Sequence, residues 1–293
     1  MLVENKIILG TVQFGLTYGI NNSNGKPNQE LVDELLDAAF DRQVRTLDTA
    51  EAYGNSQEVI GAYHKQSANQ FNIITKFSST RTDLPTDIKE RVKANIKTLG
   101  VDSLYCYMFH NYADFKSFYT EYKTKISELK KEGLIKKLGV SIYNNEELED
   151  LLKYDTIDVV QLPFNLLDNS KQRAAILRKA KAKGIEIHTR SVFLQGLFFK
   201  ELNTIPEKIK PLLNSLKEIN EIAKLNDTGL SRLALNYACQ QKFIDKVLIG
   251  VDTLAQLNQN LHLIEKPISL ELIEKINEID IKEKLLLNPS NWN

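Results

Sequence analysis

Residues 44–54 read VRTLDTAEAYG, a short apolar and β-branched run that ends in a carboxylate and, five residues later, a tyrosine. Runs of this kind recur along the chain, and each predicts a strand. The segments between them have helical spacing, as Ile88, Val92, Ile96 and Leu99 illustrate. The eight predicted strands are Lys6–Gly10, Val44–Thr49, Phe71–Lys76, Ser103–His110, Lys137–Ser141, Asp158–Gln161, Ile185–Thr189 and Lys246–Gly250.

The order of these elements favours one architecture. The long gap before the last strand predicts two helices, around Pro211–Leu225 and Ser231–Gln241. Eight strands that alternate with eight or more helices are the order of a (β/α)8 barrel, although a doubly wound open sheet alternates too and stays as the alternative. One barrel uses ~250 residues, and no linker or repeat divides this chain. We therefore predict an α/β protein with a single (β/α)8 TIM barrel domain over residues 1–293.

Composition excludes several classes of function. The chain has 38 Lys and Arg against 38 Asp and Glu, so a net charge of zero gives it no electrostatic reason to bind nucleic acid or an anionic membrane. Its two cysteines are too few for a disulfide framework or a four-thiolate zinc site. No signal peptide and no apolar stretch of ~18 residues is visible. We expect a cytoplasmic protein that binds neither nucleic acid nor membrane, as a monomer or homodimer.

Polar side chains follow three neighbouring predicted strands. Asp48 and Tyr53 follow the second strand, Lys76 ends the third, and His110 ends the fourth. The carboxyl ends of barrel strands meet at one rim, where the chemistry of such barrels is found, so these groups can converge. Each residue also has a structural alternative: Asp48 as a helix cap, Tyr53 as a packed ring, and His110 as a satisfied core histidine. A buried Lys76 needs a carboxylate partner in either case.

Together, in this order, Asp48, Tyr53, Lys76 and His110 resemble the catalytic set of the aldo-keto reductases. The resemblance extends over most of the chain, from Leu9 to Asn260, and no glycine-rich Rossmann or P-loop fingerprint competes with it. It implies binding of NADP(H) or NAD(H), without a metal, and reduction of an aldehyde or ketone. The positions that the resemblance assigns to the cofactor are Gly10, Thr11, Asp48, Ser141, Gln161, Arg190, Ser191, Gly196, Gly250, Gln256, Gln259 and Asn260.

The chemistry of carbonyl reduction asks for the same residue types. A hydride must come from a cofactor such as a nicotinamide, because no side chain donates one. Tyr53 is the candidate proton donor to the developing alkoxide. Lys76 would favour the phenolate through its charge, and Asp48 would anchor Lys76. His110 would hydrogen-bond the carbonyl oxygen and orient it.

Two positions depart from the family's pattern at the cofactor. Ile142 stands where the family commonly has Asn, and Arg190 stands where many members have an aromatic residue that stacks on the nicotinamide. A guanidinium can also stack on a ring, or bind an acidic substrate group. The loop Gly250–Gln256 carries Asp252 and no cation, although amides from Thr253 onward could hold a phosphate. The NADP preference of the family is therefore weakened in this sequence.

Substrate contacts are expected from the turn after the first strand and from the site itself. Phe14 and Tyr18 are candidates for an aromatic wall, beside Tyr53 and His110. That turn and the segment from Arg190 to Gly196 resemble a bacterial branch of the family that is linked with sugar-like substrates.

Three other functions stay open at this point. A Schiff-base aldolase would use Lys76 as its nucleophile. A metal-dependent barrel hydrolase could use Asp48, His110 and His188, although no two histidines have chelate spacing. A non-catalytic nicotinamide-binding regulatory module would keep the fold and turn over poorly, and Ile142 and Arg190 keep it in consideration.

Overall fold

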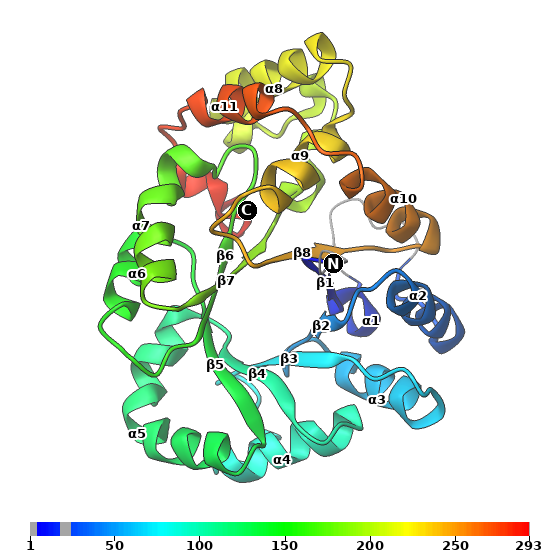
Figure 1. Ribbon diagram of the computed structural model, residues 1–293, viewed down its shortest axis with the longest axis vertical. Helices are drawn as coiled ribbons and strands as arrows, with labels where there is room; N and C mark the ends of the chain where they lie inside the picture. Colours follow the sequence, from blue (N-terminus) through cyan, green and yellow to red (C-terminus); the bar gives the residue numbers. More distant parts are fainter. Residues whose placement is uncertain (1–4, 18–24, 293) are drawn as a thin grey trace.

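Eight parallel strands close into a barrel, and helices surround it (Figure 1). The computed structural model describes residues 5–17 and 25–292. The strands are β1 Ile7–Gly10, β2 Thr46–Asp48, β3 Asn72–Phe77, β4 Leu104–Phe109, β5 Ile135–Ser141, β6 Val159–Pro163, β7 Glu186–Arg190 and β8 Lys246–Gly250. The α-helices are α1 Val12–Gly15, α2 Gln29–Asp41, α3 Ser56–Gln66, α4 Ile88–Leu99, α5 Tyr112–Lys131, α6 Asn145–Leu151, α7 Ser170–Ala182, α8 Leu213–Leu225, α9 Leu230–Cys239, α10 Leu254–Ile264 and α11 Leu270–Glu278. The 3-10 helices are η1 Leu194–Phe199, η2 Leu202–Thr204, η3 Glu207–Leu212, η4 Lys284–Leu287 and η5 Pro289–Asn291.

The pairing of β1 with β8 confirms the predicted barrel and excludes the open sheet. The two strands are in parallel register from Ile7 opposite Val247 to Gly10 opposite Gly250. All eight predicted strands and both helices predicted before β8 are present, with ends that differ by no more than two residues. Two of those helices, α8 and α9, occupy the long gap between β7 and β8.

Strand alternation divides the apolar residues into two cores. Ile8 faces the barrel interior, whereas its neighbours Ile7 and Leu9 pack outward under the helices, as the period of two along a strand requires. The interior core is the small cluster Ile8, Ile74, Cys106, Met108 and Val159. Polar residues that continue this inward face to the carboxyl end of a strand must therefore point into the mouth of the barrel.

Local signals fix the helix ends, and the N-terminal caps fix the ends of loops at the mouth. Asp87 accepts hydrogen bonds from the first amides of α4, and Gly100 ends that helix with a φ of 66°. Asn144 and Glu147 form a capping box at the start of α6. Such caps fix where each helix begins and so how long each connecting loop is.

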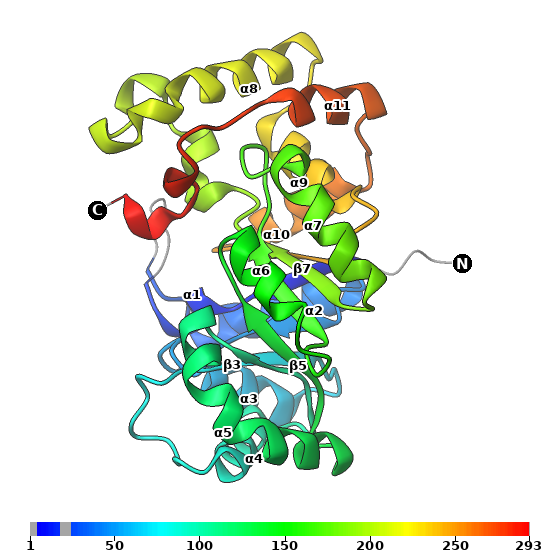
Figure 2. The ribbon, with the colours of Figure 1, turned by 90° about the vertical axis from the view of Figure 1, so that its left-hand side faces the viewer.

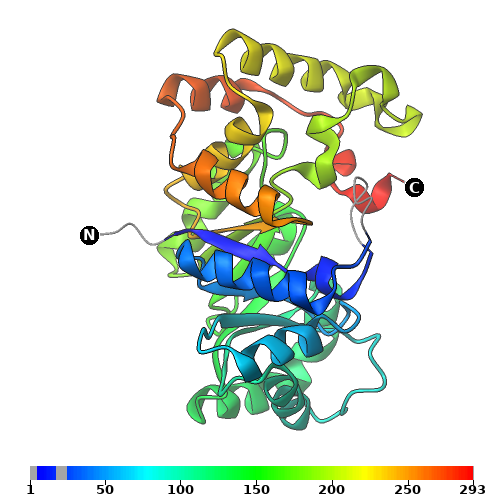
Figure 3. The same ribbon diagram turned by 90° about the vertical axis from the view of Figure 1, so that its right-hand side faces the viewer.

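The C-terminal segment lies at the end of the barrel where the strands finish. In two side views η4 and η5 lie on the same side as α1, opposite the point at which β1 begins (Figures 2 and 3). The indole Nε1 of Trp292 donates a hydrogen bond to the Leu286 carbonyl at 2.8 Å, which holds the segment folded on itself. In the described part of the chain, no helix combines the length and the apolar character that crossing a membrane requires.

Candidate active site

A buried ion pair lies at the centre of the mouth. Lys76 and Asp48 have side chains only 2% exposed, and the Lys76 ammonium pairs with one oxygen of the Asp48 carboxylate. Lys76 also donates to the Thr49 carbonyl at 3.1 Å, and the Gln161 amide donates to the second Asp48 oxygen at 2.8 Å. The pair therefore joins β2, β3 and β6 across the barrel. The helix that follows, α3, has Asn55 at its cap position, so Asp48 is not its cap.

The same pair fixes the charge of Lys76. Burial alone lowers the pKa of the Lys76 ammonium, but the Asp48 carboxylate and the Tyr53 phenol outweigh it, so that the pKa is raised. Lys76 is thus a permanent cation at neutral pH. A Schiff-base nucleophile needs a neutral amine, and this environment opposes one.

Tyr53 and His110 lie above the pair and face each other. Their rings meet edge to face with centroids 5.6 Å apart, and the Lys76 ammonium is 5.2 Å from the centre of the Tyr53 ring. Burial lowers the pKa of His110 to about 4, and the charges of Lys76 and Arg190 act in the same direction. His110 is therefore a neutral imidazole at physiological pH and can donate one hydrogen bond.

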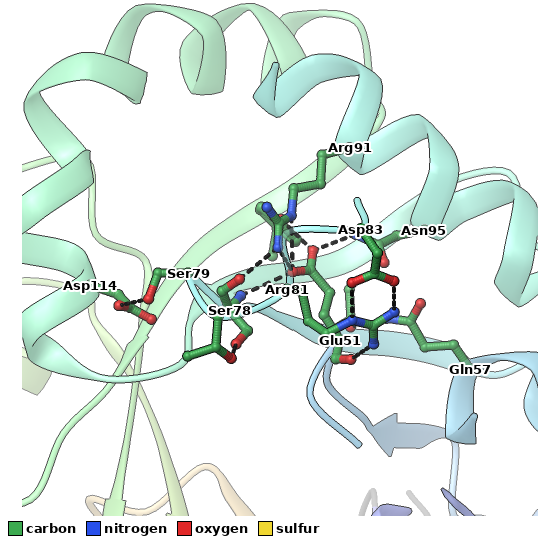
Figure 4. Close-up of polar contacts among 12 residues, drawn as sticks. Glu51, Gln57, Ser78, Ser79, Arg81, Asp83, Arg91, Asn95 and Asp114 are labelled. Carbon is green, nitrogen blue, oxygen red and sulfur yellow. Dashed lines mark hydrogen bonds and ion pairs between the residues drawn. The ribbon is translucent and has the colours of Figure 1, made fainter. Parts of the chain in front are cut away.

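Hydrogen bonds to a buried glutamate, Glu51, hold the loop that carries Tyr53 (Figure 4). One Glu51 oxygen accepts from Arg91 Nε at 3.0 Å, from Arg91 Nη2 at 2.6 Å and from the Ser78 amide at 3.0 Å. The other accepts from Asn95 at 2.7 Å and from the Tyr107 hydroxyl at 2.8 Å. Because Glu51 stands two residues before Tyr53, this network fixes the loop against β3, β4 and α4.

Sequence analysis missed this network. Its signal was present: Glu51 lies between two alanines, and Arg91 and Asn95 lie on the same face of α4 as buried Val92. Buried polar groups at helical spacing require partners.

The turn after β1 holds the Tyr53 loop from the other side. A Cβ on Gly15 would lie 1.8 Å from the Tyr53 carbonyl oxygen, so only glycine permits this contact. The Thr11 hydroxyl is fully buried and donates to the Asp48 carbonyl at 3.0 Å, and Ser56 donates to the Thr11 carbonyl at 2.8 Å. The Thr11 side chain, predicted as a cofactor contact, thus binds the protein's own backbone here.

The ends of β5, β6 and β7 form the other half of the mouth. Ser141 and Gln161 are buried and opposite each other in register, and Arg190 follows two residues after His188 on the inward face of β7. The backbone then turns sharply: Ser191 has a φ of 60° and Gly196 one of 88°. Non-glycine residues with positive φ are strained, and such strain is typical of functional loops.

Between β8 and β1 the mouth is lined by backbone and small residues. Gly10 and Gly250 are opposite each other, and a Cβ on Gly250 would lie 2.6 Å from the Gln13 amide nitrogen. The Gln13 Oε1 is buried and has no hydrogen-bond partner among the described residues.

Side chains at the start of α10 accept hydrogen bonds from some of the backbone amides there. The Gln256 amide oxygen accepts from the Asp252 amide at 2.8 Å, and the Thr253 hydroxyl accepts from the Gln256 amide at 3.2 Å. Burial raises the pKa of the Asp252 carboxyl. Further along α10, Gln259 borders a hollow of about 560 Å³ between η1, α8, α9 and α10. The next residue, Asn260, is buried.

Two other predicted residues, Phe14 and His188, lie elsewhere. Phe14 is 1% exposed and belongs to the main hydrophobic core, because α1 directs it inward, so the structure places it in packing and not on a pocket wall. Tyr18 lies outside the described residues. His188 is buried inside the barrel, where it bonds Glu186 at 2.8 Å, and among the described residues no His, Cys, Asp and Glu gather as metal ligands.

The chain is similar in sequence and in fold to known proteins. Over 302 aligned residues the chain is 22% identical to the NADH-specific methylglyoxal reductase of Escherichia coli, with 87% of this chain and 92% of that protein covered. It is 25% identical to a Schizosaccharomyces pombe protein named as a proposed voltage-gated potassium channel subunit beta, with 90% and 87% covered. The fold is similar to that of an aldo-keto reductase from Bacillus halodurans in its holo form, with a TM-score of 0.75, 20% identity and coverage of 95% and 94%.

The chain also matches a family as a whole. Residues 6–281 match the Aldo/keto reductase family, and this range includes all eight strands. The chain therefore belongs to the aldo/keto reductase family.

Proposed function

We propose that this protein reduces a small aldehyde or ketone to an alcohol, with a hydride from NADH or NADPH and with Tyr53 as the proton donor. Membership of the family supports NAD(P)-dependent reduction of carbonyl compounds. The observation that supports the finer assignment is the Lys76–Asp48 pair beneath Tyr53 and His110. Sugar-like carbonyl compounds and small dicarbonyls are the substrate classes we expect.

Each residue of the site has a role that follows from its surroundings. A bound nicotinamide supplies the hydride, since no side chain can. Lys76, kept cationic by Asp48, favours the phenolate of Tyr53 and so eases transfer of its proton to the substrate oxygen. His110, neutral because its pKa is about 4, donates a hydrogen bond to the same oxygen. The Glu51 network keeps the Tyr53 loop in place.

The residues around the mouth fit a nicotinamide dinucleotide. Ser141 and Gln161 offer hydrogen-bonding groups for the carboxamide, and the orphaned Gln13 oxygen beside Gly250 offers an acceptor for a hydroxyl. At the start of α10, Asp252 repels a 2′-phosphate, and the Gln256 side chain occupies an amide that could have bound one. We therefore expect NADH to bind more tightly than NADPH, as the name of the Escherichia coli relative says of that protein.

Two nucleotide titrations and one variant test this proposal. Quenching or enhancement of nucleotide fluorescence gives the Kd of NADH and of NADPH, and turnover of methylglyoxal is followed in parallel. Tyr53→Phe should abolish turnover with little change in either Kd. The control Tyr119→Phe, on the outer helix α5, should change neither turnover nor the two Kd values. If neither nucleotide binds at millimolar concentration, the proposal fails, and borohydride trapping on Lys76 becomes the next experiment.

A non-catalytic cofactor-binding module is the second candidate. It is favoured by the similarity to the Schizosaccharomyces pombe protein and by the departures at Ile142 and Arg190. Nucleotide binding without turnover of any aldehyde by the unaltered protein would support the module over the reductase.

A further inference from the structure

Arg190 is a cation for which the proposed mechanism has no use. It ends β7 on the inward face of the strand, in register with Pro163 of β6. Its guanidinium donates a hydrogen bond to the Ile142 carbonyl at 3.1 Å and lies 4.2 Å from the centre of the Tyr143 ring. The side chain therefore crosses over the end of β6 from β7 to β5, above Ser141 and Gln161.

Neighbouring residues hold in place the Tyr143 backbone, and so the ring against which this guanidinium lies. The Tyr143 carbonyl accepts from Arg173 at 2.6 Å, and the Tyr143 amide donates to Glu147 at 2.7 Å, so both sides of the Tyr143 backbone are fixed. Arg173 is itself held by a buried ion pair with Asp168 at 2.6 Å. The ring beneath Arg190 is thus part of a rigid surface, and a guanidinium on such a surface loses little conformational entropy on binding.

The charge of Arg190 is not neutralised. Its contacts in the described part of the chain are a carbonyl, the Ser191 hydroxyl and an aromatic ring, none of which carries a full negative charge. A second cation at the mouth, Lys76, is by contrast paired with Asp48. Half-buried charge interacts more strongly than charge in water, so the β5–β7 side of the mouth has a positive potential.

We propose that Arg190 makes this site bind the reduced form of its nicotinamide cofactor more tightly than the oxidised form. The inference rests on the proposed function, in which Ser141 and Gln161 hold the carboxamide and so bring the ring beside the guanidinium. The ring is positively charged when oxidised and uncharged when reduced, so a fixed cation repels only the oxidised form. The preference follows from charge alone and needs no change in the shape of the site.

The preference has a consequence for the direction of reaction. When an alcohol is oxidised, hydride leaves its carbon for the ring and cancels the ring's charge, while the hydroxyl proton leaves through Tyr53. Because Arg190 destabilises the charged ring, the equilibrium between bound species lies further towards the carbonyl and NADH than the equilibrium in water.

The test measures the two dissociation constants separately, without turnover. NADH is titrated by fluorescence and NAD⁺ by calorimetry, for the unaltered protein and for Arg190→Met, Arg190→Gln and Arg190→Lys. We expect the ratio of the NAD⁺ Kd to the NADH Kd to fall roughly tenfold in the Met and Gln variants, which corresponds to about 1.4 kcal/mol. Arg190→Lys, which keeps the charge, should stay within about twofold of the unaltered protein.

A matched control and three outcomes make the result decisive. Arg178→Met removes an arginine from the outer helix α7 and should leave the ratio unchanged. An unchanged ratio in both the Met and Gln variants overturns the inference. So does an equal rise of both constants, since Arg190 would then bind a group that is the same in both redox states. If the unaltered protein binds neither dinucleotide, the proposed function has failed.

Discussion

Arg91→Met should lower the free energy of unfolding by about 3–5 kcal/mol, the usual cost of removing one partner from a buried ion pair. The Glu51 side chain is fully buried and that of Arg91 is 6% exposed. Met keeps much of the length of Arg91 but removes both guanidinium hydrogen bonds to Glu51 and the one to the Ser78 carbonyl at 2.6 Å. Three neutral donors then remain to the Glu51 carboxylate, which loses its direct ion-pair partner. Arg81 still acts on it through charge, but the Arg81 guanidinium bonds the Glu51 carbonyl and not the carboxylate.

The assay is urea unfolding at pH 7, with Lys93→Met as the control. Lys93 lies on the same helix and pairs with Glu90 at 2.9 Å, but their side chains are 48% and 60% exposed. An exposed pair of this kind contributes about 0–1 kcal/mol. The difference between the two variants therefore isolates the effect of burial from that of losing a positive charge on α4.

A double variant identifies the cause. Glu51→Gln removes the charge that Arg91→Met leaves unpaired, so the combined variant should be more stable than Arg91→Met by about 1–3 kcal/mol. If Arg91→Met costs under about 1 kcal/mol, or if adding Glu51→Gln brings no recovery, the Glu51–Arg91 pair does not stabilise the loop as we have argued.

The remaining predictions concern Gly15 and His110. Gly15→Ala places a Cβ 1.8 Å from the Tyr53 carbonyl oxygen, so it should lower the free energy of unfolding by about 1–3 kcal/mol and remove most of the aldehyde turnover. A Cβ on the control position, Gly229, meets nothing within 4 Å, so Gly229→Ala should change neither stability nor turnover. Equal behaviour of the two variants would contradict the proposed contact. The His110 ring should titrate by NMR with a midpoint near pH 4, because burial and then the Lys76 charge lower its pKa to about 4 from 6.5. Since the folded pKa lies below the unfolded one, the stability that His110 contributes is complete above pH 6.5 and is lost as the pH falls from 6.5 towards 4; a midpoint near pH 6.5 would refute this account.

The strands could be predicted from the sequence because each has a local signal. A short apolar run with β-branched residues is visible within one element, and the observed ends differ by at most two residues. Closure of the sheet has no such signal. It depends on hydrogen bonds between β1 and β8, which are more than 230 residues apart, and an open sheet has the same order of elements.

Convergence of the polar residues could be predicted for a related reason. Parallel strands place their carboxyl ends on one rim, so Asp48, Lys76 and His110 had to be neighbours once the barrel was assumed. No comparable rule predicts which side chains of loops and helices contact one another. The Glu51–Arg91 pair spans 40 residues and joins a turn to a helix, and the direction in which the short helix α1 points Phe14 depends on the turn before it.

The two departures from the family pattern, far apart in sequence, prove to be one feature of the structure. The Ile142 side chain is fully buried in the main core, so the end of β5 carries no side-chain amide towards the mouth. The polar group that remains there is the Ile142 carbonyl, and the guanidinium of Arg190, 48 residues later, bonds it. At this corner of the mouth the polar side-chain group is therefore a cation on β7, and not an uncharged amide at position 142. A neutral amide interacts alike with both redox states of a nicotinamide, whereas a cation does not. We therefore expect a site with Arg190 at this corner to favour the reduced state, with Asp48, Lys76 and His110 placed as the family pattern predicts.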